Sequence, residues 1–147
     1  MKIYLGADHN GFALKKNLRE YLGKAGYDVV DDGDVELRPD DDYPVFAQKV
    51  VNDLLLSDDR EPRGILICGS GQGMCMDANR FKGIRALLGY SRESIKDARN
   101  DDDANVLCLP SIHFNDGTAN SLVETFLNTP FAGASRYKRR IHEMDDI

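Results

Sequence analysis

The sequence predicts an α/β protein with a Rossmann-like, mainly parallel five-stranded sheet inside a three-layer α/β/α sandwich. Two observations support this fold class. Short apolar runs, typical of strands covered on both faces, alternate with stretches in which apolar residues recur every three or four positions. Such alternation implies crossover connections, which make the strands parallel and place helices on both faces of the sheet. A chain of 147 residues fits one domain, residues 1–147.

The elements follow one another in a regular order. Apolar runs predict strands at 3–5, 27–30, 64–67, 84–88 and 105–109. Helices are predicted where apolar residues share one face, at Leu14, Leu18 and Leu22, at Phe46, Val50 and Leu54, and at Leu122, Val123, Phe126 and Leu127. A further helix is expected over 74–81. An acidic loop at 31–42 and a basic tail from residue 131 interrupt the rhythm.

Composition narrows the class of function. The net charge of -6 and the pI near 5.0 argue against a nucleic-acid partner, which requires a basic face. No apolar run approaches the roughly 20 residues of a membrane span, and the start is too quickly polar for a signal peptide, so we expect a cytoplasmic protein without a membrane partner. The three cysteines have neither zinc-site nor disulfide spacing.

The loop CGSGQG follows a predicted buried strand and precedes a predicted helix. Gly69, Gly71 and Gly73 allow positive φ, so that successive N–H groups can point into one hollow that suits an oxyanion. The spacing fits neither a phosphate-binding loop with its lysine nor the dinucleotide fingerprint. A plain tight turn is the alternative interpretation of these glycines.

Cys68 stands at the end of the strand that leads into this loop. There the same N–H groups and the helix dipole would stabilise a thiolate. Packing as a small core residue is the alternative for Cys68, and it is our interpretation of Cys75 and Cys108. A redox pair of Cys68 with Cys75 is a further possibility, although the two lack CxxC spacing.

Other candidate site residues lie in the loops that follow strands, where ligands bind in open parallel sheets. Asp8 and His9 end the first strand, and His9 can bind an anion or move a proton, unless this segment serves only as a helix cap. Tyr43 can donate a hydroxyl hydrogen bond or simply pack. Arg136 and Arg140, four apart on a predicted helix, can clamp a phosphate or remain solvated.

Six motifs resemble, in the same order and over nearly the whole chain, those of ribose-5-phosphate isomerase B and of the galactose-6-phosphate isomerase subunits. They are GADHNG, DYP, CGSGQGM, GIRA, DANVL and PFAGASRYKRRI. The resemblance implies the sandwich fold predicted above. It also implies homodimers, which can pair further into tetramers, with active sites that combine residues of both subunits.

The resemblance also assigns roles to the candidate residues. Cys68 matches the catalytic base and Ser70 a hydroxyl position, while the loop from Gly69 to Gly73 matches the part that stabilises the oxyanion. Asp8 and His9 match substrate contacts, to which we add Tyr43, and Arg136 and Arg140 match phosphate ligands. An aldose–ketose conversion through an enediolate needs these parts without a metal or another cofactor. The scattered His9, His113 and His142 have no metal-ligand spacing.

The chain departs from the family pattern at three places. Asp101, Asp102 and Asp103 stand where ribose-phosphate enzymes have His-Asn-Asp, whose histidine opens the sugar ring. We expect Asp101 to take that catalytic role and Asp102 to contact substrate, unless the run is a solvated acidic turn. Ile112 and Tyr137 replace two phosphate ligands, for which His113 and Lys138 are possible substitutes.

The sequence therefore predicts an isomerase that interconverts ribose 5-phosphate and ribulose 5-phosphate, with Cys68 as base. The departures leave open an isomerase of another sugar phosphate, such as galactose 6-phosphate or a four-carbon sugar phosphate. They also leave open a sugar-phosphate-binding relative without catalysis.

Overall fold

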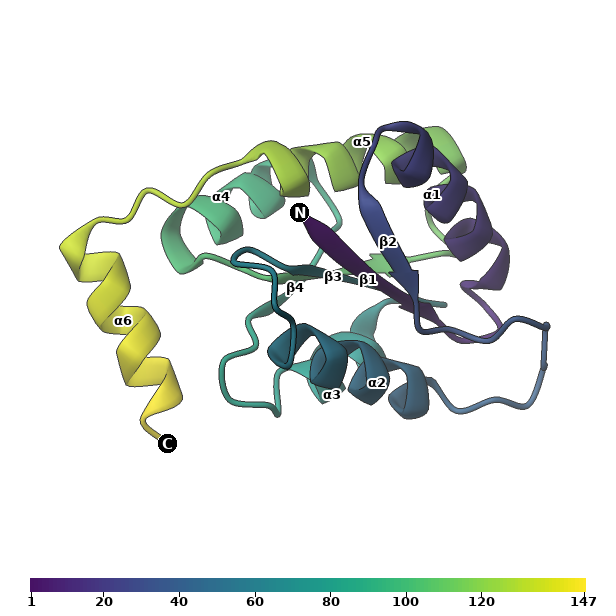
Figure 1. Ribbon diagram of the computed structural model, residues 1–147, viewed down its shortest axis with the longest axis horizontal. Helices are drawn as coiled ribbons and strands as arrows, with labels where there is room; N and C mark the ends of the chain where they lie inside the picture. Colours follow the sequence, from purple (N-terminus) through teal and green to yellow (C-terminus); the bar gives the residue numbers. More distant parts are fainter.

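Five parallel strands form one sheet in the order β2-β1-β3-β5-β4. The computed structural model describes residues 1–147 (Figure 1). Its elements are β1 Lys2–Ala7, α1 Phe12–Lys24, β2 Asp28–Asp31, α2 Tyr43–Leu55, β3 Arg63–Cys68, α3 Gln72–Ala78, β4 Ala86–Leu88, α4 Arg92–Asp102, β5 Val106–Pro110, α5 Asp116–Asn128 and α6 Ser135–Asp145. The predicted five-stranded α/β sheet is confirmed.

Helices cover both faces of the sheet and divide the core in two. One cluster joins α1, α4 and α5 to side chains of β1, β3 and β5 such as Leu5, Ile67 and Leu109. The other joins α2 and α3 to the alternate side chains of the same strands, among them Leu66 and Cys108. Figure 1 shows these two helical layers on either side of the strands. The three-layer sandwich predicted from the alternating pattern is therefore correct.

Strand burial matches the sequence pattern at the centre of the sheet and differs at one edge. All residues of β3 and β5 are buried, as their continuous apolar runs predict. The run 84–88 also suggested a strand covered on both faces, but β4 begins only at Ala86 and is partly exposed, because it is an edge strand that pairs with β5 alone. The helix expected over 74–81 spans Gln72–Ala78.

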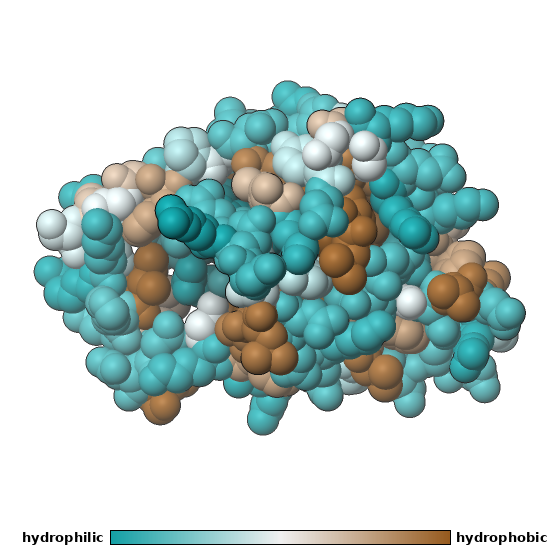
Figure 2. All heavy atoms as spheres, viewed as in Figure 1, coloured by the Kyte–Doolittle hydropathy of each residue, from teal (hydrophilic) through white to brown (hydrophobic).

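Two helices lie outside the apolar pattern. Helix α4 buries only Ile95 and Arg99, and α6 buries no residue. Helix α6 lies beside α4 at one end of the molecule (Figure 1). Its last turn is tied to the loop before β4, where the Gly83 N–H donates to Asp145 Oδ1 at 3.0 Å. The surface seen in Figure 2 is mostly hydrophilic, with apolar side chains in small separate patches. No helix combines the length and apolarity needed to cross a membrane.

The strand order places a ligand-binding edge between β1 and β3. From β1 the chain moves outward to β2 and then returns to the other side of β1 as β3. The loops that leave the carboxyl ends of β1 and β3 therefore run to opposite faces and open a crevice between them. Asp8 and Cys68 stand at these two strand ends.

Candidate active site

The loops after β1 and β3 pack directly against each other at the carboxyl edge of the sheet. The Asp8 N–H donates to the carbonyl of Ile67 at 3.2 Å. A Cβ at Gly69 would lie 3.3 Å from Asn10 Nδ2, and one at Gly11 would lie 2.6 Å from the carbonyl oxygen of Ile67. The close approach requires glycine at position 11, so the sequence brings GADHNG and CGSGQG together as predicted.

The CGSGQG loop turns back on the Cys68 thiol. Gly71 adopts the left-handed conformation, with φ of 76°, directly before α3. This turn brings the N–H groups of Ser70, Gly71 and Met74 to the Cys68 sulfur. The Ser70 hydroxyl accepts a hydrogen bond from the Gln72 N–H at 3.3 Å. These N–H groups act on the thiol electrostatically, and none of them forms a hydrogen bond to Sγ.

The acidity of Cys68 differs from the sequence expectation. We expected the N–H groups and the helix dipole to stabilise a thiolate, yet the pKa of the Cys68 thiol is raised. Burial is the main cause, since only 5% of the residue is exposed, and the Asp8 carboxylate adds to it. The N–H groups of Met74, Gly71 and Ser70 oppose this rise without outweighing it.

Asp8 and His9 are held in place by different partners. Asp8 Oδ1 accepts the N–H groups of Asn10 and Gly11 at 3.0 and 3.2 Å, and burial raises the pKa of its carboxyl. His9 Nδ1 lies 2.7 Å from Asp41 Oδ1, which also accepts the His9 N–H. This hydrogen bond raises the pKa of His9. Asp41 is a site residue that the sequence analysis missed, because nothing in the acidic loop distinguishes it from its neighbours.

Three of these side chains could also hold a metal ion. Asp8, His9 and Asp41 each offer a ligand atom, and these atoms lie within 4.8 Å of one another. The His9 and Asp41 atoms are, however, hydrogen-bonded to each other, and Asp8 already accepts two N–H groups. The arrangement is explained by hydrogen bonding, and we assign no metal to it.

Tyr43 reaches the same crevice from α2. A Cβ at Gly73 would lie 2.6 Å from Tyr43 Cζ, so the ring lies flat against the glycine backbone at the start of α3. The residue remains 40% exposed. Tyr43 therefore packs against the glycine-rich loop, as one of the two interpretations of this residue expected. Its place beside the crevice is also compatible with a substrate contact.

The loop after β5 closes the third side of the crevice. The N–H groups of Ser111 and Ile112 donate to the carbonyls of Cys68 and Gly69 at 2.9 and 3.2 Å. The hydroxyl of Tyr90 donates to the Ser70 carbonyl at 2.8 Å. The hydroxyl oxygen of Ser111 is buried without a hydrogen-bond partner. Sequence reasoning had missed Tyr90 and Ser111, which carry no motif signal.

The remaining predicted site residues lie at the opposite edge of the sheet. Asp101 and Asp102 end α4, just before β5 begins, and Asp103 lines a cavity with Arg63, the first residue of β3. Strand β3 is six residues long from Arg63 to Cys68, so this edge is roughly 17 Å from Cys68. Arg136 and Arg140 lie on α6, which packs beside α4. One chain therefore does not bring the predicted site residues Asp101, Asp102, Arg136 and Arg140 to its own Cys68.

Comparison with known proteins decides the family. A model of the ribose/galactose isomerase family matches residues 3–144. The chain belongs to this family. Among the family's members, a probable ribose-5-phosphate isomerase B of Mycoplasma genitalium is 41% identical over 97% of this chain and 92% of its own length. Ribose-5-phosphate isomerase B of Mycobacterium tuberculosis is 33% identical over 96% of this chain and 86% of its own.

Solved structures of the family share the fold along the whole chain. A ribose 5-phosphate isomerase B of Thermotoga maritima superposes with a TM-score of 0.93 at 40% identity, covering 99% of this chain and 98% of that one. The Mycoplasma genitalium ribose-5-phosphate isomerase B, solved with bound ribulose-5-phosphate, gives a TM-score of 0.90 at 41% identity, covering 97% and 93%. The family resemblance drawn from the six motifs is confirmed.

Proposed function

We propose that this family member is an aldose–ketose isomerase that interconverts ribose 5-phosphate and ribulose 5-phosphate without a metal. The observation that carries the proposal is the Cys68 thiol, buried at the end of β3 where the loops after β1 and β3 pack together, with the N–H groups of Ser70, Gly71 and Met74 acting on it. The relatives named ribose-5-phosphate isomerase B, one of them bound to ribulose-5-phosphate, support the choice of substrate.

The chemistry assigns each part a step. The Cys68 thiolate takes the proton from C2 of the open-chain aldose and returns it to C1, which yields the ketose. Ser70 moves a proton between O1 and O2, and the N–H groups of the loop stabilise the enediolate oxygen. A raised pKa reduces the fraction of thiolate at neutral pH but makes that thiolate a stronger base toward a carbon acid.

A second copy of the chain completes the site in our proposal. Asp101, Asp102, Arg136 and Arg140 lie at the sheet edge opposite Cys68, so they can act only on the crevice of a partner. A two-fold dimer would place them there twice, because each copy then offers both edges to the other. Arg136 and Arg140 would bind the phosphate, and Asp101 would accept the ring hydroxyl proton.

The change at position 101 favours a second candidate function. An aspartate where ribose enzymes have a histidine favours a substrate that needs little ring opening. A four-carbon sugar phosphate, which is presented open-chain, would then be isomerised faster than ribose 5-phosphate. Galactose 6-phosphate, whose ring must open as well, stays a separate alternative. A non-catalytic sugar-phosphate-binding relative is the third possibility, and thermal stabilisation by ribose 5-phosphate without turnover would identify it.

A panel of aldose phosphates assayed with the wild type, Cys68→Ala and Asp101→His tests these proposals. We expect ribose 5-phosphate to be turned over and Cys68→Ala to lose about 10²–10⁴-fold in kcat. Cys75→Ala, which removes another buried thiol within α3, is the matched control and should keep the activity. Full activity of Cys68→Ala would refute the proposed base. A large gain in Asp101→His would indicate a natural substrate that is already open-chain.

A further inference from the structure

A second cavity lies at the amino edge of the sheet and is polar. It has a volume of about 230 Å³ and is formed by the end of α2 and the segments that lead into β3, β4 and β5. Its lining residues are Leu54, Arg60, Glu61, Pro62, Arg63, Arg85, Asp103 and Asn105. We call it the arginine cavity. Neither Cys68 nor the pair Arg136 and Arg140 lines it.

Arg63 is the unusual residue of this cavity. Only 7% of it is exposed, and its Nε has no hydrogen-bond partner. Its Nη1 donates to the carbonyl of the preceding Pro62 at 3.0 Å. Its one ion-pair partner is Glu61, 3.9 Å from Nη2, whose side chain is 72% exposed. A buried guanidinium that lacks a close counter-ion is costly, so an acceptor is missing here.

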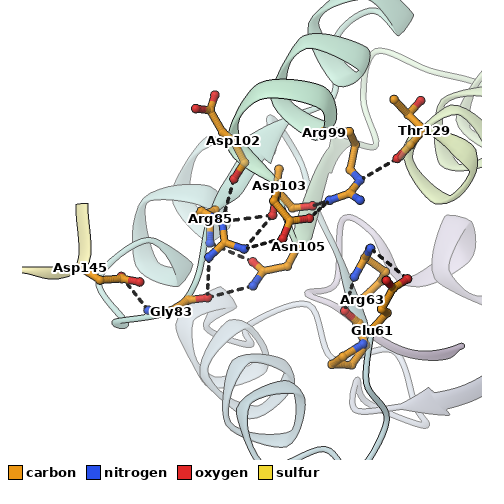
Figure 3. A network of polar contacts seen from close by, with 12 residues as sticks. Glu61, Arg63, Gly83, Arg85, Arg99, Asp102, Asp103, Asn105, Thr129 and Asp145 are labelled. Carbon is orange, nitrogen blue, oxygen red and sulfur yellow. Dashed lines mark hydrogen bonds and ion pairs between the residues drawn. The ribbon is translucent and has the colours of Figure 1, made fainter. Parts of the chain in front are cut away.

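Asp103, the other acid of the cavity, is already engaged by two further arginines. Its Oδ1 lies 2.7 Å from Arg99 Nη1 and its Oδ2 lies 3.3 Å from Arg85 Nη2. Figure 3 shows both guanidinium groups directed at this carboxylate, while Arg63 stands apart beside Glu61. Asp103 therefore favours the charge of Arg63 only from a distance and forms no ion pair with it.

The charge around Arg63 is consequently positive. Arg85 and Arg99 share the carboxylate of Asp103, Arg63 has only the distant carboxylate of Glu61, and Arg60 adds a fourth guanidinium at the rim. Burial lowers the pKa of Arg63, and the nearby Arg99 charge lowers it further. Both effects would be relieved by an anion in the cavity.

We propose that the arginine cavity binds a small oxyanion of the phosphate class. A guanidinium offers parallel N–H groups that match two oxygens of a phosphate, and Arg63, Arg85 and Arg60 would approach it from three segments of the chain. The polar groups that the cavity leaves without close partners are guanidinium N–H groups, which need an oxyanion, and inorganic phosphate is its simplest form. This site does not depend on the proposed isomerase function.

Thermal unfolding in phosphate, compared with chloride at equal ionic strength, tests the site. The background is the double variant Arg136→Ala/Arg140→Ala, in which the phosphate clamp of the proposed active site is removed. We expect phosphate to raise the Tm of this background in a saturable way. Arg63→Gln should weaken phosphate binding at least about tenfold and Arg60→Ala a few-fold, because the first loses a buried charged donor and the second an exposed one.

Two further variants make the result unambiguous. Glu61→Gln removes the competing carboxylate and should tighten phosphate binding a few-fold, an effect of opposite sign that general destabilisation cannot mimic. Arg38→Ala removes an arginine that is 63% exposed and does not line the cavity, and it should leave binding unchanged. If Arg63→Gln fails to fold, Arg60→Ala and Glu61→Gln decide. The proposal is overturned if phosphate does not raise the Tm of the Arg136→Ala/Arg140→Ala background. It is also overturned if neither Arg60→Ala nor Glu61→Gln changes the affinity for phosphate.

Discussion

Asp32 holds a carboxyl group in an environment that disfavours its charge. The residue follows β2, is only 4% exposed, and its Oδ2 is buried without a hydrogen-bond partner. Lys49 Nζ lies 3.5 Å from Oδ1 but is itself largely exposed. Burial, together with the nearby charge of Asp53, raises the pKa of Asp32 from 3.8 to about 6.

This raised pKa makes Asp32 a destabilising group at neutral pH. The folded state holds the Asp32 proton more tightly than the unfolded chain, so stability falls as pH rises from about 4 to about 6 and stays lower above that window. Asp32→Asn should therefore raise the free energy of unfolding by about 3 kcal/mol at pH 8 and leave it unchanged below pH 4. Urea unfolding at pH 4, 6 and 8 measures this difference.

The matched control is Asp58→Asn, because the Asp58 side chain is 92% exposed and pairs only with Lys2. It should change stability little at any of the three pH values. A stabilisation by Asp32→Asn that is the same at pH 4 and pH 8 would contradict the titration argument and indicate a packing effect.

At the scale of elements, two helical glycines provide a matched pair. Gly73 in α3 lies under the Tyr43 ring, where an added Cβ would come within 2.6 Å of Cζ, whereas a Cβ at Gly23 in α1 would meet nothing within 4 Å. Gly23→Ala should stabilise the protein by about 0.5–1 kcal/mol through helix propensity. Gly73→Ala should lose that gain and displace Tyr43 from the crevice.

Unfolding and steady-state kinetics separate the two effects. We expect Gly73→Ala to lower kcat/KM, and the additional change Tyr43→Ala to recover stability because it removes the clashing ring. If Gly73→Ala stabilised the protein as much as Gly23→Ala and left kcat/KM intact, the contact between Tyr43 and α3 would have no functional part.

The sequence predicts those strands and helices that bury apolar side chains in a regular pattern along their own length. The strands β1, β3 and β5 and the helices α1, α2 and α5 carry clear stripes, and the structure has them. Helix α4 lacks a stripe because its buried residues are Ile95 and the guanidinium of Arg99, which packs over the Phe126 ring and donates to Thr129 and Ala104. A charged residue buried through long-range hydrogen bonds leaves no periodic signal.

The site follows the same rule. Cys68, Asp8 and His9 were predictable because they end strands that the apolar pattern locates. Asp41 and Tyr90 were not, because they reach the crevice across 32 and 20 positions of chain, as the contacts of Asp41 with His9 and of Tyr90 with the Ser70 carbonyl show. The raised pKa of Cys68 depends on how deeply the folded chain buries the thiol, which no motif encodes.

At the scale of the whole molecule, the proposed shared site predicts complementation between inactive variants. Cys68→Ala destroys one half of the site and Arg136→Ala/Arg140→Ala the other. When the two variants are co-refolded in equal amounts, about half of the dimers are mixed and each mixed dimer has one intact site, so activity should return to about a quarter of the wild-type value. Isomerase assays of the separate and mixed proteins measure this.

Each variant refolded alone serves as the control and should stay inactive. Recovery should also fall on dilution if the dimer dissociates. A mixture without activity would mean that Cys68 and the arginines of α6 do not serve the same site, or that the two copies never combine.

In the proposed dimer, the position of the site residues at two opposite edges of one sheet also has a genetic consequence. An allele that changes only Cys68, or only the arginines of α6, would spare one site in every mixed dimer and so behave as recessive. An allele that carries both changes in one chain would spoil both sites of every mixed dimer, leaving about a quarter of the dimers active, and would act dominantly. The topology of a single sheet would thus determine whether a mutation in one gene copy is recessive or dominant.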